Sequence, residues 1–182
     1  MVTPNEYRQL KAFARIDGMR LGILWIISFA CFIGNFSNPI LGTVGMLLVL
    51  YTPFFVALRL KKFRDRIRDG YISFRRSLAY VIFVFFYGSL ILATAQYIYL
   101  AFIDHGYIMM QYSKLFSTPE IKQMMRQMGN AKAMNDAMQA LSSTRPIELV
   151  LNFLSIDITT GIILGFPIAA IMKRTQTINQ IN

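Results

Sequence analysis

One acidic residue, Asp157, lies inside a long apolar stretch and is the side chain of this 182-residue sequence best placed to do chemistry. An ionised carboxylate within a bilayer is costly unless it is paired, hydrated or protonated. Asp157 could therefore serve a proton or cation path, or bind a polar part of a lipid-linked substrate. Alternatively, hydroxyl groups of the apolar stretch 77–103 hold it, and it fixes helix register. We favour this structural interpretation, because no second charge lies deep in an apolar stretch to complete a relay.

Small residues follow Asp157 at intervals of four, which places them on its own face of a helix. Gly161-x-x-x-Gly165 allows a neighbouring helix to approach closely, and Asn152 adds a polar group to the same stretch. We predict a packing face here and expect a membrane-protein partner or a second copy of the chain to use it.

Two further groups of residues suggest chemistry that the rest of the sequence does not support. Sulfur ligands favour Cu(I), but methionine also packs adaptably, and closely spaced Met–His blocks are absent. The methionines concerned lie near His105 in one segment: Met109, Met110, Met124, Met125, Met128, Met134 and Met138. Asp104–His105 pairs an acid with the histidine but lacks a nucleophile, so we interpret it as the polar end of a helix. We therefore predict no metal, no cofactor and no enzymatic activity.

Four apolar stretches set the fold class. They cover approximately residues 20–36, 40–60, 77–103 and 147–172. About 20 apolar residues cross the roughly 30 Å hydrocarbon layer as a helix. The sequence therefore predicts an all-α polytopic membrane protein with four transmembrane helices, a single domain over 1–182 and an outer loop at 104–146.

The first two spans must form a hairpin, because no charged residue occurs from Leu21 to Leu58. Asn35–Phe36–Ser37–Asn38–Pro39 has the composition of a turn. Before the first span, the spacing of apolar residues suits a helix lying on the membrane surface, and a solvated lead-in is the equal alternative.

Basic residues indicate the orientation. The formal net charge is +10, and eight basic residues lie between Arg59 and Arg76. The positive-inside rule places both termini in the cytoplasm and the 104–146 loop outside. The candidate contacts to lipid headgroups are Arg59, Lys61, Lys62, Arg64, Arg66 and Arg68. Because these cations flank apolar spans, we expect membrane lipids, not nucleic acid, as their counter-charge.

The outer loop is too long for a simple connector. Ser117–Thr118–Pro119–Glu120 has the residues of a helix start, and Gly129–Asn130 marks a break. We predict two short amphipathic helices here, resting on the bundle or the bilayer.

Several short blocks resemble one known family. These are Phe63–Arg64–Asp65, Gly70–Tyr71–Ile72–Ser73–Phe74, Tyr97–Ile98–Tyr99, Phe102–Ile103–Asp104 and Gly165-x-Pro167 before Lys173. The chain resembles the domain of unknown function 4199 family, small four-span proteins found chiefly in Bacteroidota. Arg75–Arg76 and the methionine-rich loop depart from that pattern. The resemblance implies a bacterial inner-membrane location and four helices, but no activity, ligand or catalytic residue.

We expect a non-catalytic accessory or scaffold subunit that engages lipid or an enzyme of envelope biogenesis. The alternative is a small transporter or channel component that works as an oligomer and uses Asp157. An integral-membrane enzyme is the third hypothesis, disfavoured because the sequence lacks an acid–base set.

Overall fold

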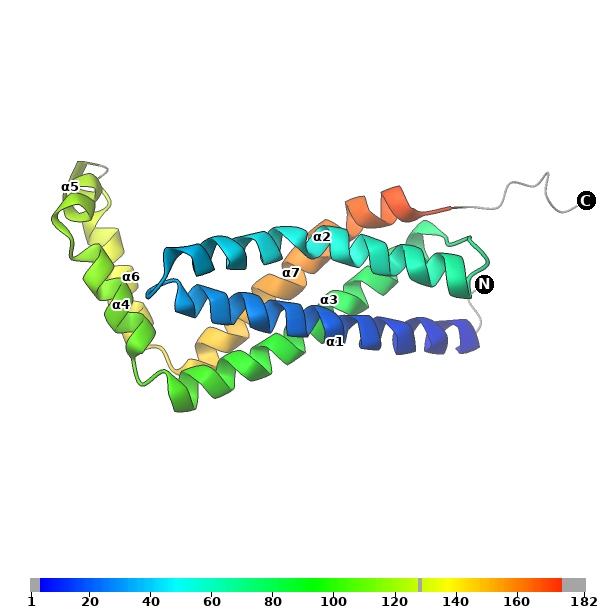
Figure 1. The fold of residues 1–182 in the computed structure, drawn as a ribbon, viewed down its shortest axis with the longest axis horizontal. Coiled ribbons are helices and arrows are strands. Elements are labelled where there is room, and N and C mark those ends of the chain that lie inside the picture. The colour runs from blue at the N-terminus through cyan, green and yellow to red at the C-terminus, as the bar shows by residue number, and fades with distance from the viewer. Residues whose placement is uncertain (1–3, 128, 175–182) are drawn as a thin grey trace, which may run out of the picture. The chain divides into compact units, whose positions relative to one another are not determined.

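The protein is all-helical over residues 4–127 and 129–174, which the computed structural model describes (Figure 1). Two compact units make up the chain, the first covering Met1–Thr94 and Phe153–Asn182 and the second Ala95–Asn152. The predicted fold class is confirmed, whereas the single domain over 1–182 stays a prediction.

Four long helices supply the predicted spans. They are α1 (Pro4–Gly34), α2 (Pro39–Ile67), α3 (Phe74–Ile98) and α7 (Pro146–Met172). Each is long and apolar enough to cross a membrane, and α3 continues through the π-helical segment η1 (Tyr99–Ile103) as one apolar stretch. All four predicted spans are confirmed as helices.

Short polar segments end the helices where the sequence indicated. Asn38 caps α2 by accepting the backbone N–H of Ile40 at 3.0 Å, which fixes the α1–α2 hairpin. At its other end, α2 stops before Asp69 and Gly70, whose φ angles are +50° and +83°. The Gly70 N–H then donates to the carbonyl of Arg64 at 3.1 Å, which completes the helix end.

The segment before the first span differs from both predictions. Residues 4–19 are neither a separate surface helix nor a solvated lead-in, because they continue α1 without a break. Besides Gly18 and Gly22, the buried residues of α1 follow one another at steps of three or four: Leu10, Ala14, Asp17, Leu21, Trp25 and Ser28. This spacing faces one side of a helix toward its neighbours, so the segment packs in the bundle.

Glycines let α1 cross α3 closely. A Cβ added at Gly18 would lie 2.6 Å from the Cβ of Tyr87 and 2.8 Å from the carbonyl oxygen of Val84. On α3, a Cβ added at Gly88 would lie 3.3 Å from the carbonyl oxygen of Gly18. Gly18-x-x-x-Gly22 is thus a second small-residue packing motif, which was not predicted from the sequence.

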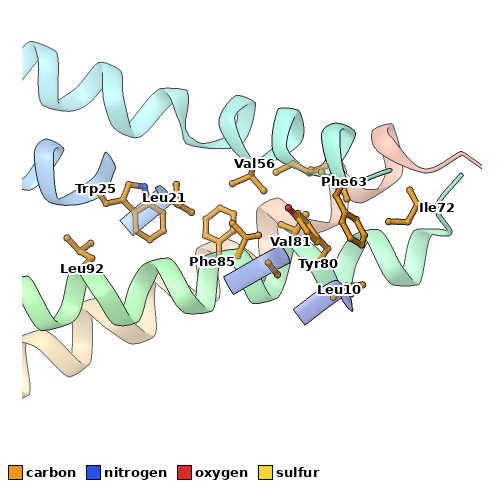
Figure 2. Close-up of a cluster of buried hydrophobic side chains, with 14 residues drawn as sticks. Leu10, Leu21, Trp25, Val56, Phe63, Ile72, Tyr80, Val81, Phe85 and Leu92 are labelled. Atoms are coloured by element: carbon orange, nitrogen blue, oxygen red, sulfur yellow. The ribbon is translucent and has the colours of Figure 1, made fainter. Parts of the chain in front are cut away.

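The core of the first unit lies between these helices. Figure 2 shows Trp25 and Leu21 of α1 beside Phe85 of α3, with Val56 of α2 nearby. The rings of Trp25 and Phe85 meet edge to face, with centroids 5.7 Å apart. The indole N–H of Trp25 also donates to the Thr52 hydroxyl at 2.9 Å, which joins α1 to α2. The Ser28 hydroxyl donates to the Gly45 carbonyl at 2.9 Å in the same hairpin, so apolar packing and buried polar contacts together hold α1 against α2.

The second unit contains three short helices where two were predicted. They are α4 (Tyr107–Phe116), α5 (Pro119–Gln127) and α6 (Ala131–Ser143). The predicted start of α5 at Pro119 and the break at Gly129, where φ is +68°, are confirmed. Met128 lies outside the described residues.

The sequence analysis did not predict α4, because the residue that caps this helix lies before the usual N-cap position. Its N-terminal neighbour Gly106 has no side chain to cap it. The Asp104 carboxylate instead accepts the backbone N–H groups of Gly106 and Ile108, each at 3.1 Å. Asp104 is therefore a capping residue at the end of the third span, in agreement with its interpretation as a polar helix end.

Candidate functional site

A buried carboxylate links three helices at the end of the first unit where α2 stops and α3 begins, hereafter the basic end. Asp17 of α1 is 4% exposed. It accepts hydrogen bonds from Arg20 Nη1 at 2.8 Å, from Arg59 Nε at 2.7 Å and from the Tyr80 hydroxyl. Arg59 Nη2 also pairs with it. Because Arg59 belongs to α2 and Tyr80 to α3, this carboxylate fixes the relative positions of three helices.

Aromatic packing holds the Tyr80 hydroxyl in place. The ring of Tyr80 is fully buried and stacks on Phe63 of α2, with centroids 4.9 Å apart and planes inclined by 18°. Figure 2 shows the two rings side by side. Phe13 of α1 packs on Phe63 in turn, at 5.5 Å. The stack on Phe63, which Phe13 supports, therefore holds the Tyr80 ring with its hydroxyl directed at Asp17.

Further polar contacts join the remaining helix ends. Glu6 of α1 pairs with Arg68 and with Arg76, both at 2.7 Å. Arg64 Nη1 donates to the carbonyl of Met172 at 3.0 Å, which connects α2 to α7. The basic end therefore forms one hydrogen-bonded assembly of all four helices.

Ile72 and Arg174 extend this assembly to the last described residue. They exchange two backbone hydrogen bonds of 2.9 and 3.0 Å, which close the α2–α3 connection onto the end of α7.

The structure divides the six candidate headgroup contacts into two sets. Arg59, Arg64 and Arg68 make the intramolecular ion pairs or hydrogen bonds described above, so they are helix-linking residues. The other three are exposed and make no ion pair with any residue in the described part of the chain: Lys61, Lys62 and Arg66.

Two pockets open at the basic end. One, of about 380 Å³, lies beside the Glu6 ion pairs and is lined by Arg68, Arg76 and Arg174 among others. The other, of about 300 Å³, lies between α1 and α2, where Lys62 and Arg66 line it together with the Asp17 cluster. Both have an excess of cationic side chains in their lining, and apolar side chains of α1 and α2 complete the second one.

The intramembrane carboxylate Asp157 has no partner among residues 4–127 and 129–174. It is half-buried on α7. Two hydroxyls of the third span bond within their own helix, since Ser89 donates to the Phe85 carbonyl at 2.7 Å and Thr94 to the Leu90 carbonyl at 2.8 Å. The structural interpretation of Asp157 stays a prediction.

The small-residue face of α7 packs within this chain. A Cβ added at Gly161 would overlap the Cβ and Cγ of Phe85, and one at Gly165 would lie 3.1 Å from Leu78 Cδ1. The close approach of a helix is thus observed, and that helix is α3 of the same chain. A membrane-protein partner or a second copy of the chain stays a prediction. Asn152 is exposed in the second unit and takes no part in this packing.

The sequence reading missed the residue that organises the basic end. The sequence analysis did not single out Asp17, although it stands at a buried step of the pattern Leu10, Ala14, Leu21. An acid at such a position requires a buried cation or hydroxyl from another helix, and that requirement was the available signal.

These observations define a class: a four-span helical membrane protein whose spans are joined at one end by buried ion pairs. The family model described as "Protein of unknown function (DUF4199)" matches residues 17–174, and the chain belongs to this family. The resemblance seen in the sequence is thereby confirmed. No curated protein and no solved structure matches the chain.

Proposed function

We propose that this protein is a non-catalytic accessory or scaffold subunit of the bacterial inner membrane, with both termini in the cytoplasm. In this role it engages anionic lipid and a membrane-protein partner involved in envelope biogenesis. The observation that carries the proposal is that the charged residues of the basic end fall into two sets, one that links helices and one that stays exposed. Ion pairs of the buried Asp17 and the half-buried Glu6 hold the helix ends together, while Lys61, Lys62 and Arg66 stay exposed.

A rigid cationic end suits attachment more than turnover. Positive residues favour the cytoplasmic side, where the leaflet is anionic, and each contributes about 1 kcal/mol of attraction near the surface. Ion pairs that tie α1, α2 and α3 together keep these charges in a fixed arrangement. Such an arrangement supplies a defined surface on which a partner can assemble.

Co-purification tests the proposal. The tagged full-length chain, extracted from its own membranes in mild detergent, should retain a stoichiometric membrane-protein partner identified by mass spectrometry. A tagged four-span protein of unrelated sequence is the control for adventitious capture. Recovery of the chain without a partner, or substrate turnover by the isolated chain, would contradict the scaffold role.

The orientation has its own test. A periplasm-only reporter enzyme should be inactive when fused after Asn182 and active when inserted between Gly129 and Asn130. Activity of the C-terminal fusion would reverse the proposed orientation.

A second candidate function, a small transporter or channel component, is favoured by the unpaired Asp157 carboxylate. Asp157→Asn should leave the free energy of unfolding unchanged or raised, because it removes a costly charge without breaking a described contact. In this second function, the substitution also abolishes proton or cation flux measured in proteoliposomes.

Asp69→Asn makes the same chemical change at an exposed turn and is the matched control. Flux that survives Asp157→Asn, or that is absent from the unaltered protein, rules out this second candidate. Destabilisation by Asp157→Asn would support the structural interpretation, in which Asp157 fixes helix register.

A further inference from the structure

The pocket between α1 and α2 combines a buried acid with an excess of cations. Asp17 and Arg20 line it from α1, and Arg59, Lys62 and Arg66 line it from α2, in a volume of about 300 Å³. Four cationic side chains therefore face one carboxylate. The pocket carries an uncompensated positive charge that an anion would balance.

The cations retain unused hydrogen-bond donors. A guanidinium has five N–H donors. Arg59 directs its Nε and Nη2 groups to Asp17, and Arg20 directs its Nη1 group to the same carboxylate. Arg20 is about half exposed, at 48% of its side chain. Lys62 and Arg66 form no ion pair within the described residues and are exposed. Several donors are thus free to meet a ligand oxygen at the pocket.

The position of the pocket along the helices points to a lipid. Arg20 and Arg59 are the first charged residues on either side of the uncharged run Leu21–Leu58, so they mark the boundary of the hydrocarbon layer. Lipid phosphates lie at this level. Arg59, Lys62 and Arg66 are spaced by three and four residues, which aligns them on one face of α2.

We propose that this pocket binds the phosphate of an anionic phospholipid in the surrounding leaflet. Lys62 and Arg66 contact the phosphate oxygens, and Asp17 is a positioning residue that holds Arg59 beside them. The apolar walls supplied by Phe13 and Ile16 lie against the glycerol and the first acyl carbons. This inference rests on the lipid-binding part of the proposed function and names its site.

Native mass spectrometry of the purified full-length chain in neutral detergent, titrated with phosphatidylglycerol, tests the assignment. The unaltered protein should bind one lipid in preference to phosphatidylcholine. Lys62→Gln with Arg66→Gln should raise the Kd for phosphatidylglycerol about 30-fold, because each cation near the lipid surface lowers the Kd about fivefold.

Lys173→Gln with Arg75→Gln is the matched control. It removes one lysine and one arginine that are exposed at the same end but do not line the pocket. We expect this variant to bind phosphatidylglycerol within about twofold of the unaltered protein, since it keeps all pocket cations. Equal weakening by both double variants would show general charge attraction and overturn the site, as would no weakening by Lys62→Gln with Arg66→Gln.

Soluble phosphate provides the remaining comparison. Inorganic phosphate, added at the same ionic strength as a chloride control, should not displace the bound phosphatidylglycerol. Displacement would assign the pocket to a soluble phosphate compound and overturn the lipid assignment. None of these results depends on partner recovery, so loss of the lipid site and loss of the scaffold role are distinguishable.

Discussion

Asp17→Ala should lower the free energy of unfolding by about 3–5 kcal/mol, because it leaves a partly buried Arg59 and the fully buried Tyr80 hydroxyl without their acceptor. The change removes the contact that joins α1, α2 and α3, so the loss should exceed that of any exposed ion pair in the protein. Unfolding in mixed detergent micelles, followed by circular dichroism during titration with sodium dodecyl sulfate, measures this difference.

Two further substitutions separate the contributions to the Asp17 cluster. Tyr80→Phe removes only one hydrogen bond and keeps the stack on Phe63, so it should cost about 1 kcal/mol. Arg59→Ala in the background of Asp17→Ala should add little, since the charge that Asp17 balances is then gone. A loss below about 1 kcal/mol for Asp17→Ala would contradict the cluster as the link between helices, because removing one partner of a buried pair should cost more.

Gly161→Ala should produce the second large effect, a loss of about 1–3 kcal/mol or a failure of α7 to pack on α3. The added Cβ would fall onto the Cβ and Cγ of Phe85 and lie 2.7 Å from its Cδ1. Atoms so near the α3 backbone cannot rotate away, and therefore the two helices must separate. The same detergent titration measures the loss.

Gly165→Ala is the matched control on the same face of α7. Its Cβ would meet Leu78 Cδ1 at 3.1 Å, and this methyl group is the far end of a flexible side chain. We expect a loss below about 1 kcal/mol, because a small rotamer change relieves the contact. Equal losses at the two glycines would mean that α7 packs on α3 in a different register.

Most features that depend on neighbouring residues were predicted from the amino-acid sequence, with α4 as the exception. Apolar length predicted four spanning helices, and the Asn35–Pro39 turn was found where its residues indicated. The start of α5 at Pro119 followed from capping chemistry in the same way. Such features have local causes, namely backbone preferences and the length of an apolar stretch. These causes can be inferred from a single sequence.

Features that depend on another helix were predicted poorly. The spacing of Gly161 and Gly165 shows that a helix can approach but not which one, and the tertiary structure places α3 there. Likewise, Arg59, Arg64 and Arg68 look the same in sequence as Lys61, Lys62 and Arg66. Only their distance from Asp17, Glu6 and Met172 separates helix-linking cations from exposed ones.

The sequence by itself therefore determined the membrane-spanning class, the number of spans and the excess of cations at one end. Tertiary structure decided that residues 4–19 belong to the bundle, that Asp17 is the centre of the basic end and that Asp157 has no described partner. The reason is physical. Hydrophobic length and turn preference act within one segment, whereas a buried carboxylate is stabilised by donors from helices far away along the chain.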